Sequence, residues 1–229
     1  MSEQPAGLEQ ILLQAIKLYQ QGRTRETGEL CRDILESAPD EPNALHLLGV
    51  VHLMNGDAAR AAETLTAAAR VDTGNADILN NFASALRKTG DAEQTEQIYR
   101  RAFALDGSSA KSHVNLANLY RGTGDFARAA RHYRNALAKD PNHFRALNNL
   151  GLTLEALDEP FLALGLYQRA IAARPKNSEP LHNLARLLGK LGEWRTSLDT
   201  FDGLAQLDSE NGRYQTGRGI ALAKLDRMV

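Results

Sequence analysis

Hydrophobic and polar positions along this chain follow a helical period that restarts at regular intervals. Residues 110–143 show it most clearly, because their first half marks one helix face with the i, i+3, i+4 and i+7 spacing. Those positions hold His113, Leu116, Ala117 and Tyr120. A second stripe of small and apolar residues runs through Ala129, Tyr133 and Ala136. The pattern predicts two amphipathic helices within this stretch.

The turn between the two stripes has a signal of its own. Gly124 is expected to end the first helix, because glycine takes the left-handed conformation found just past a helix C-terminus. Asp125 then begins the second helix near the positive end of its dipole, and Asp140-Pro141 ends it. The turn position recurs as Gly22, Gly56, Gly90, Gly124 and Gly192, with Asp158 in that place once. Aspartate tolerates the left-handed region better than most residues do.

The whole chain is built from such units. Shifting the sequence by 34 residues places it on itself without an insertion, which indicates a repeat architecture. The six units span residues 8–41, 42–75, 76–109, 110–143, 144–177 and 178–211. We predict an N-terminal tail at 1–7 and a partial seventh repeat or capping helix at 212–229. Twelve or thirteen helices of about a dozen residues follow, with no strand.

The pattern resembles the tetratricopeptide repeat, a helix–turn–helix unit of 34 residues, over 8–211 and the partial unit. The motif residues in units two to five are Leu48-Gly49, Ala61, Phe82-Ala83, Tyr99, Ala102, Leu116-Ala117, Tyr120, Tyr133, Leu150-Gly151, Tyr167 and Ala170. In the first unit, Gln14, Thr27 and Cys31 depart from the motif. The resemblance implies an all-α fold, an α-solenoid whose repeats form a right-handed superhelix. It also implies that the first helix of each repeat lines a concave groove.

Asparagines recur on the face of the first helices opposite the buried stripe. The sixth repeat position reads Leu13, Leu47, Asn81, Asn115, Asn149 and Asn183, and the fifth reads Leu12, His46, Asn80, Val114, Asn148 and His182. An amide donates and accepts at once, so a row of amides suits an extended peptide backbone. This row resembles the inner surface of O-linked N-acetylglucosamine transferases, which implies that Asn81, Asn115, Asn149 and Asn183 hold peptide. Amides that bond only each other or water are the structural alternative.

We therefore predict a peptide-binding groove. Its residues are Asn80, Asn81, Lys111, Asn115, Asn118, Arg145, Asn148, Asn149, His182 and Asn183. The charged groove positions are mildly basic, since Arg87, Lys88, Lys111, Arg121, Arg145, Arg186 and Lys190 outnumber Asp77, Glu155 and Glu179. An acidic segment or a free carboxylate fits such a surface, although a solvated charged face has the same composition. The carboxylate clamp of chaperone-binding tetratricopeptide domains is disfavoured, because only Asn81 and Lys111 fit it while His46, Val50 and Asn115 do not.

The first two units present a different, apolar inner face. We predict a contact surface there formed by Leu12, Leu13, Ile16, Leu47, Val50 and Met54. Exposed apolar patches of this kind usually bind a partner, a second copy or a wrapped segment. The alternative is that these side chains are buried against their own helices.

Composition excludes several function classes. The 229 residues are 43% hydrophobic and 24% charged with a net charge of −1, so no general attraction to nucleic acid or anionic membrane is expected. A single cysteine, Cys31, fits a reducing compartment, and no secretory leader or membrane-spanning run is visible. We expect a cytoplasmic protein without a cofactor or metal, because the six histidines have no ligand spacing. Nucleotide-binding and hydrolase motifs are also missing, so we expect no enzyme activity.

Three functions remain open. The first is a protein-interaction scaffold that binds an extended peptide or partner segment in its groove. The second is the substrate-recruiting N-terminal region of a larger sulfotransferase or glycosyltransferase, whose activity would lie beyond Val229. The third is a self-assembly module, a homo-oligomer formed through the N-terminal repeats.

Overall fold

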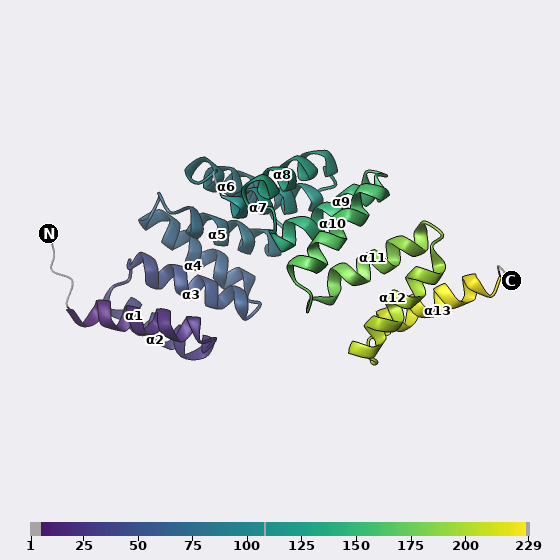
Figure 1. Ribbon diagram of the computed structural model, residues 1–229. Coiled ribbons are helices and arrows are strands. Elements are labelled where there is room, and N and C mark those ends of the chain that lie inside the picture. Colours follow the sequence, from purple (N-terminus) through teal and green to yellow (C-terminus); the bar gives the residue numbers. More distant parts are fainter. Residues whose placement is uncertain (1–5, 108, 228–229) are drawn as a thin grey trace. The chain divides into compact units, whose positions relative to one another are not determined.

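The computed structural model describes residues 6–107 and 109–227, and it consists of helices joined by short turns (Figure 1). Within those residues there are thirteen helices and no strand, which confirms the all-α solenoid. They are α1 (Ala6–Gln20), α2 (Thr24–Ser37), α3 (Pro42–Met54), α4 (Ala58–Val71), α5 (Ala76–Thr89), α6 (Ala92–Leu105), α7 (Ala110–Gly122), α8 (Phe126–Lys139), α9 (Phe144–Ala156), α10 (Pro160–Ala173), α11 (Ser178–Lys190), α12 (Trp194–Leu207) and α13 (Gly212–Leu225).

The two chain ends only partly follow the predicted division. Of the expected tail at 1–7, residues 1–5 lie outside the described part of the chain, and Ala6 and Gly7 already belong to α1. In the expected partial repeat at 212–229, α13 covers all but the last residues, of which 228 and 229 lie outside the described part.

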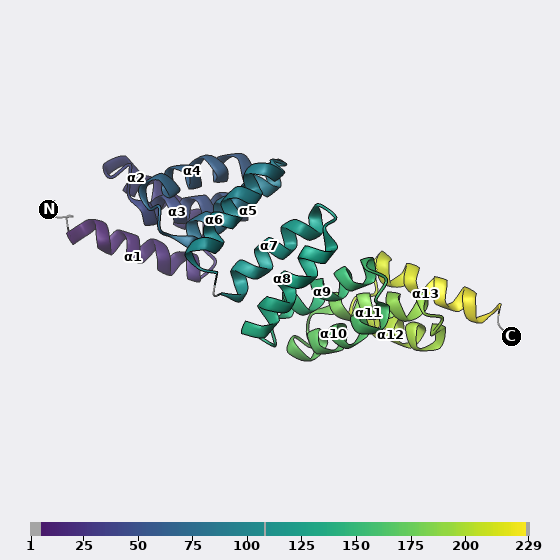
Figure 2. The ribbon, with the colours of Figure 1, turned by 90° about the horizontal axis from the view of Figure 1, so that it is seen from above.

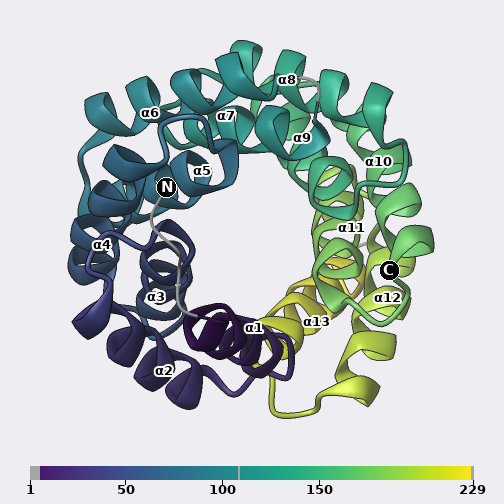
Figure 3. The same cartoon turned by 90° about the vertical axis from the view of Figure 1, so that its left-hand side faces the viewer.

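The helices form two compact units. The N-terminal unit comprises Met1–Ser108 with α1 to α6, and the C-terminal unit comprises Ser109–Val229 with α7 to α13 (Figure 2). The division falls between the third and fourth repeats. In the N-terminal unit, α1, α3 and α5 lie on one side and α2, α4 and α6 on the other (Figure 3). In the C-terminal unit, α7, α9, α11 and α13 likewise share one side, which we call the first-helix face.

The turn residues adopt the conformation predicted for them. The backbone φ angle is 75° at Gly22, 83° at Gly56, 94° at Gly90, 82° at Gly124, 86° at Gly192 and 60° at Asp158. At the next residue, Asp125 caps α8 because its Oδ1 accepts from the Arg128 backbone N–H at 2.9 Å. The sequence signals for the helix–turn–helix unit are therefore confirmed in the backbone.

Small residues let the two helices of a repeat approach closely. Ala129, Ala136, Ala163 and Ala170 are all fully buried in the C-terminal unit. Gly151 on α9 faces Tyr167 on α10 so closely that a Cβ there would lie 2.6 Å from the tyrosine ring. Large side chains fill the remaining space, and each fully buried one contributes on the order of 1.5–3 kcal/mol.

Among the described residues, none of the helices combines the length and the hydrophobicity that crossing a membrane requires.

Candidate functional site

Four asparagines in the C-terminal unit form a continuous hydrogen-bonded chain, which we call the amide network. Asn149 on α9 donates from Nδ2 to Asn118 Oδ1 on α7 at 2.9 Å. Its neighbour Asn148 donates to Asn149 Oδ1 at 3.3 Å and accepts from Asn183 Nδ2 on α11 at 3.0 Å. The network thus joins the first helices of three consecutive repeats, and Asn118 Oδ1 also accepts from the Tyr133 hydroxyl at 2.6 Å.

The four asparagines of this network differ in how far their side chains are buried. Asn148 is 2% exposed and Asn183 is 8% exposed, whereas Asn118 and Asn149 are half-buried. The remaining hydrogen of the Asn148 amide is directed to Glu179 Oε1 at 3.1 Å, so its polar atoms are satisfied within the protein. The repeat pattern predicted Asn148 on the open face. The structure instead buries it between α9 and α11, where it orients the more exposed amides.

The N-terminal unit shows the same division at its asparagine pair. Asn80 is 3% exposed, so it too lies between helices rather than on the open face where sequence analysis placed it. Asn81 is half-buried, and its Nδ2 lies 2.8 Å from His46 Nε2 on α3. In both pairs the first asparagine is packed inside, and the second remains partly accessible.

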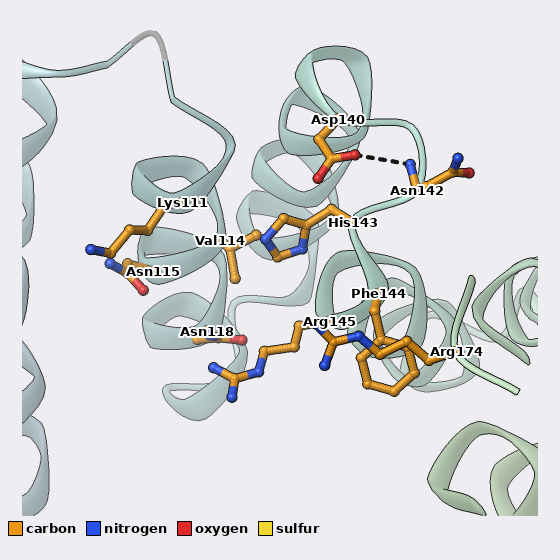
Figure 4. A pocket seen from close by; sticks show the side chains of 10 residues that line it. All are labelled: Lys111, Val114, Asn115, Asn118, Asp140, Asn142, His143, Phe144, Arg145 and Arg174. Carbon is orange, nitrogen blue, oxygen red and sulfur yellow. Dashed lines mark hydrogen bonds between the residues drawn. The ribbon is translucent and has the colours of Figure 1, made fainter. Parts of the chain in front are cut away.

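A pocket of about 490 Å³ opens on the first-helix face of the C-terminal unit (Figure 4). We call it the cationic pocket. It is lined by Lys111, Val114, Asn115, Asn118, Asp140, Asn142, His143, Phe144, Arg145 and Arg174. Four of these are predicted groove residues: Lys111, Asn115, Asn118 and Arg145. The α7 residues and the turn from α8 to α9 thus converge on one concave site.

The polar groups of this pocket are mainly hydrogen-bond donors. Both hydrogen bonds of the Asn118 side chain use its Oδ1, so its NH₂ group has no partner among the described residues. His143 caps α9 because its Nδ1 accepts from the Ala146 backbone N–H at 3.2 Å. In that arrangement the ring proton lies on Nε2, which is also a donor. The pocket therefore suits a ligand that accepts hydrogen bonds.

Charge reinforces this preference. Lys111, Arg145 and Arg174 face a single carboxylate in the pocket, Asp140. Within the described chain, Arg145 makes no ion pair, and the Arg174 guanidinium lies 5.1 Å from the centre of the Phe144 ring. The guanidinium groups of Arg145 and Arg174 therefore attract anions, and each can bind a carboxylate with two hydrogen bonds.

The residues that the turns contribute to the pocket, Arg174 and His143, were not among the predicted groove residues. Arg174 occupies the last position of its helix pair, where the other repeats carry Ala38, Asp72, Asp106, Asp140 and Asp208. The change from aspartate to arginine at this repeat position was the sequence signal that could have indicated Arg174. His143 likewise stands at the N-cap position, which holds Glu41, Asn75, Ser109, Asn177 and Asn211 elsewhere.

A second pocket, of about 590 Å³, lies further along the same face, and we call it the α11 pocket. It contains the predicted groove residues His182 and Asn183, of which Asn183 also belongs to the amide network, together with Glu179, Arg186, Arg213 and Tyr214. The Nδ1 atom of His182 is buried without a hydrogen-bond partner in the described structure. Burial lowers the pKa of His182, helped by Arg213 and Arg186, so the neutral ring is favoured.

The buried carboxylate of Glu155 on α9 neutralises part of the positive charge on α11. Glu155 is 8% exposed at its side chain and accepts from Arg186 at 2.6 Å and Lys190 at 3.2 Å. It also accepts from the Tyr167 hydroxyl at 2.6 Å. Burial raises the pKa of Glu155, but the Tyr167 hydrogen bond and the Arg186 charge outweigh it and lower the pKa overall. Arg186 and Lys190 are therefore engaged by Glu155, whereas Arg145 and Arg174 of the cationic pocket make no ion pair within the described residues.

The predicted apolar surface of the N-terminal unit is partly accessible. Leu13 is 59% exposed and Met54 is 56% exposed. The other members, Leu12, Ile16, Leu47 and Val50, are half-buried. Cys31 is fully buried nearby, and burial raises its pKa to about 11, so it is packed as a small apolar residue rather than poised as a thiolate.

Sequence comparison gives one family along most of the chain. Tetratricopeptide repeat family models match residues 18–80, 74–142, 114–178 and 166–199. No curated protein sequence matches the chain.

Solved structures share the fold at low sequence identity. The type IV pilus biogenesis factor PilW is 16% identical, with 93% of this chain and 99% of that chain covered and a TM-score of 0.85. The pilF protein of Pseudomonas aeruginosa is 20% identical, with 93% and 96% covered and a TM-score of 0.78. YrrB, described as a tetratricopeptide protein with an unusual peptide-binding site, is 19% identical, with 76% and 89% covered and a TM-score of 0.59.

Proposed function

This chain belongs to the tetratricopeptide repeat family, and we propose that it is an interaction scaffold whose C-terminal unit binds an extended, acidic peptide segment. The segment lies along the first-helix face, from the cationic pocket toward the α11 pocket. A peptide carboxylate occupies the cationic pocket, and the amide network supports the backbone beside it.

The cationic pocket carries this proposal. Its donors and the guanidinium groups of Arg145 and Arg174 fit an anion better than a neutral or basic side chain. Its volume of about 490 Å³ holds one or two side chains rather than a folded partner. An acidic segment would gain its specificity here, while the rest of the face contributes contacts that depend less on sequence.

An extended conformation follows from the polar groups of the face. Asn118 and Asn149 are half-buried, so they retain donors and acceptors for a peptide backbone. The cationic pocket lies beside α7 and the start of α9, and the α11 pocket lies mainly between α11 and α13. Two helix widths of about 10 Å each therefore separate them, which corresponds to an extended segment of about six residues. The neutral, unpartnered Nδ1 of His182 at the far end offers one further polar contact.

One relative of known fold supports the general idea. YrrB is described as having a peptide-binding site on the same kind of repeat scaffold. The alternative in which these repeats recruit substrate to a transferase would use the same face and stays a prediction.

Fluorescence anisotropy with three labelled decapeptides tests the proposal. Their sequences alternate alanine with aspartate, lysine or serine, and their C-termini are amidated. We expect only the aspartate peptide to bind, and Arg145→Glu to weaken it about tenfold or more, because the variant places a carboxylate at the pocket. Arg195→Glu, the same change at an exposed position of α12, is the matched control.

Two results would count against the proposal. One is equal affinity for the acidic and basic peptides. The other is an equal effect of the Arg145 and Arg195 substitutions, which would show that net charge rather than the cationic pocket decides binding. Circular dichroism of both variants verifies that the helices are retained.

A second function, self-assembly through the N-terminal unit, is supported by a separate observation. Leu13 and Met54 are more than half exposed, and large apolar side chains in such positions favour contact with another chain. Sedimentation velocity of the wild-type chain and a Leu13→Ser/Met54→Ser variant tests it. A monomer at every concentration for both proteins would remove this candidate.

A further inference from the structure

The second helix of the fifth repeat, α10, carries exposed apolar residues where the other repeats are polar or small. Phe161 is 75% exposed and Leu162 is 59% exposed. The same two positions in the other second helices read Arg25-Glu26, Ala59-Arg60, Glu93-Gln94, Ala127-Arg128 and Arg195-Thr196. Packing within the repeat does not require these two side chains, because the other repeats fold without them.

One turn further along α10, a glycine replaces a polar residue. Gly165 stands at the position that holds Glu29, Glu63, Gln97, Arg131 and Asp199 in the other repeats. A Cβ at Gly165 would meet no atom within 4 Å, so no close helix contact demands the glycine. Glycine is a poor residue in a helix interior, and here its effect is to leave the surface beside Leu162 open.

Leu162 and Gly165 border a groove of about 570 Å³ in the C-terminal unit, which we call the outer groove. It is lined by residues of the second helices α8 and α10. These helices lie on the side of the unit away from the first-helix face (Figure 3). Leu150 and Leu154 of α9, both buried, form its floor. Leu137 of α8 and Leu162 of α10 form its walls.

The rim of the outer groove is positively charged. Arg134 on α8 and Arg169 on α10 both line it and are both exposed. Neither makes an ion pair within the described chain; Arg169 donates to the Pro141 carbonyl at 2.8 Å, and its charge remains uncompensated. A complementary partner therefore carries apolar residues for the floor and carboxylates for the rim.

The chemistry of the groove also selects the conformation of its occupant. The floor is built from leucine side chains, which cannot bond the N–H and C=O groups of an extended peptide. A helix satisfies those groups internally and presents only side chains. The first-helix face, by contrast, carries asparagine amides that can bond an extended peptide backbone.

We propose that the outer groove is a second docking site, which binds an acidic amphipathic helix of a partner protein. The leucine floor receives the apolar face of that helix in the manner of helix-in-groove recognition. Arg134 and Arg169 pair with carboxylates beside the apolar stripe. Since this site and the cationic pocket lie on opposite sides of the unit, both can be occupied at the same time.

A labelled synthetic helix of about 18 residues, with leucines on one face and glutamates elsewhere, is the probe. Its counterpart replaces every glutamate by lysine, and a third version carries a central proline that breaks the helix. With the full chain, we expect the acidic helix alone to bind measurably in fluorescence anisotropy. Leu162→Arg and Gly165→Gln should each reduce that affinity about tenfold, because they put a charge or a long side chain into the groove.

Thr196→Arg is the matched control, because it makes the same kind of change at the corresponding position of α12. Both Leu162→Arg and Gly165→Gln place the residue type of another repeat at an outward position, so the fold is expected to survive them. Circular dichroism and thermal melting of each variant check this.

Several outcomes would overturn the proposal. Equal binding of the acidic and basic helices would show that Arg134 and Arg169 do not select the ligand. Undiminished binding of the proline version would show that the ligand need not be helical. A concentration-dependent dimer that Leu162→Arg abolishes would assign the groove to a second copy of the chain. Loss of the probe on Arg145→Glu but not on Leu162→Arg would place it on the first-helix face.

Discussion

The side-chain amide of Asn183 donates to Asn148 Oδ1 at 3.0 Å, although the two residues are 35 positions apart in the sequence. This bond is buried, and it joins the first helices of the fifth and sixth repeats through polar side chains rather than apolar ones. Asn148 is also bonded to Asn149 and Glu179, so each of its polar atoms has a partner. A helix that carries two adjacent asparagines is thus stabilised by the neighbouring repeats.

Asn148→Ala should destabilise the chain by about 2 kcal/mol, because it leaves the Asn183 amide buried without an acceptor. Urea denaturation followed by circular dichroism measures the change. Asn135→Ala, at an exposed position of α8, makes the same substitution without breaking a network and should raise stability by about 0.5 kcal/mol through helix propensity. Equal effects of the two substitutions would mean that the amide network contributes nothing.

The repeat spacing made the helices and turns predictable, because each repeat applies the same local rules. A glycine or aspartate after a helical stripe predicted a left-handed residue, and Asp158 adopts a φ of 60° as Gly124 adopts 82°. The alanines of the predicted second stripe, Ala129 and Ala136, are fully buried. These features depend on neighbours within the same repeat, so a single sequence is enough to derive them.

The site was only partly predictable, because its details depend on side chains that reach between repeats. Lys111, Asn118 and Arg145 were expected on one face and do line one pocket. The burial of Asn148 was not predicted, because its position lies at the edge of that face. Whether such a position is covered depends on the side chains of the neighbouring helix α11. The pairing of Glu155 with Arg186, 31 residues away, depends in the same way on side-chain reach.

Glu155→Gln should lower stability by about 1–2 kcal/mol, because a buried, charge-assisted acceptor is replaced by a neutral one. The loss is moderated because Arg186 and Lys190 can turn to solvent. The variant should also bind the aspartate decapeptide several-fold more tightly, since two cations become available on the first-helix face. Glu63→Gln, at an exposed position of α4, controls for the change in net charge.

The contribution of Glu155 should also depend on pH. Its pKa is lowered in the folded chain, so its stabilising effect is present above the pKa of the unfolded state and is lost as pH falls through the folded value. Denaturation of wild type and Glu155→Gln at pH 7 and at low pH should therefore show the difference between them shrinking in acid. A difference that is constant with pH would contradict the ionised form assigned to Glu155.

Gly165→Ala should raise stability by about 0.5–1 kcal/mol, because the new methyl group meets no atom within 4 Å and alanine is the better helix former. Gly151→Ala makes the same chemical change in the neighbouring helix with the opposite result. There the methyl group would lie 2.6 Å from the Tyr167 ring, so the helices must separate and stability should fall. Thermal melting of both variants distinguishes a glycine needed for packing from one that is not.

A histidine pair should make the C-terminal unit less stable in mild acid. The Nδ1 atoms of His113 and His132 lie 3.1 Å apart, so one ring must accept and the two cannot both be protonated in this arrangement. Burial, followed by the charge of His113, lowers the pKa of His132 to about 4, and burial also lowers that of His113. Protonation is therefore easier in the unfolded chain, and stability should decline from about pH 6.5 toward pH 4.

His132→Phe keeps a ring beside Tyr120, 5.6 Å away between ring centres in the wild type, and cannot titrate. The loss of stability between pH 7.5 and pH 5.5 should be smaller in this variant than in wild type. Restricting the comparison to that range leaves the carboxylates ionised. Equal losses in the two proteins would show that the histidine pair does not set the pH dependence.

Arg174 provides the sharpest test of the cationic pocket, because its position accepts aspartate elsewhere in the chain. The backbone angles there are φ −143° and ψ 79°, close to the −150° and 89° of Asp208, so Arg174→Asp fits without strain. The fold should lose at most about 1 kcal/mol, from the contact between the guanidinium and the Phe144 ring. Affinity for the aspartate decapeptide should fall about tenfold or more, while Arg174→Lys should retain most of it, because a cation is kept. Anisotropy titrations and urea denaturation of both variants separate these effects, and equal binding by the lysine and aspartate variants would exclude Arg174 from the site.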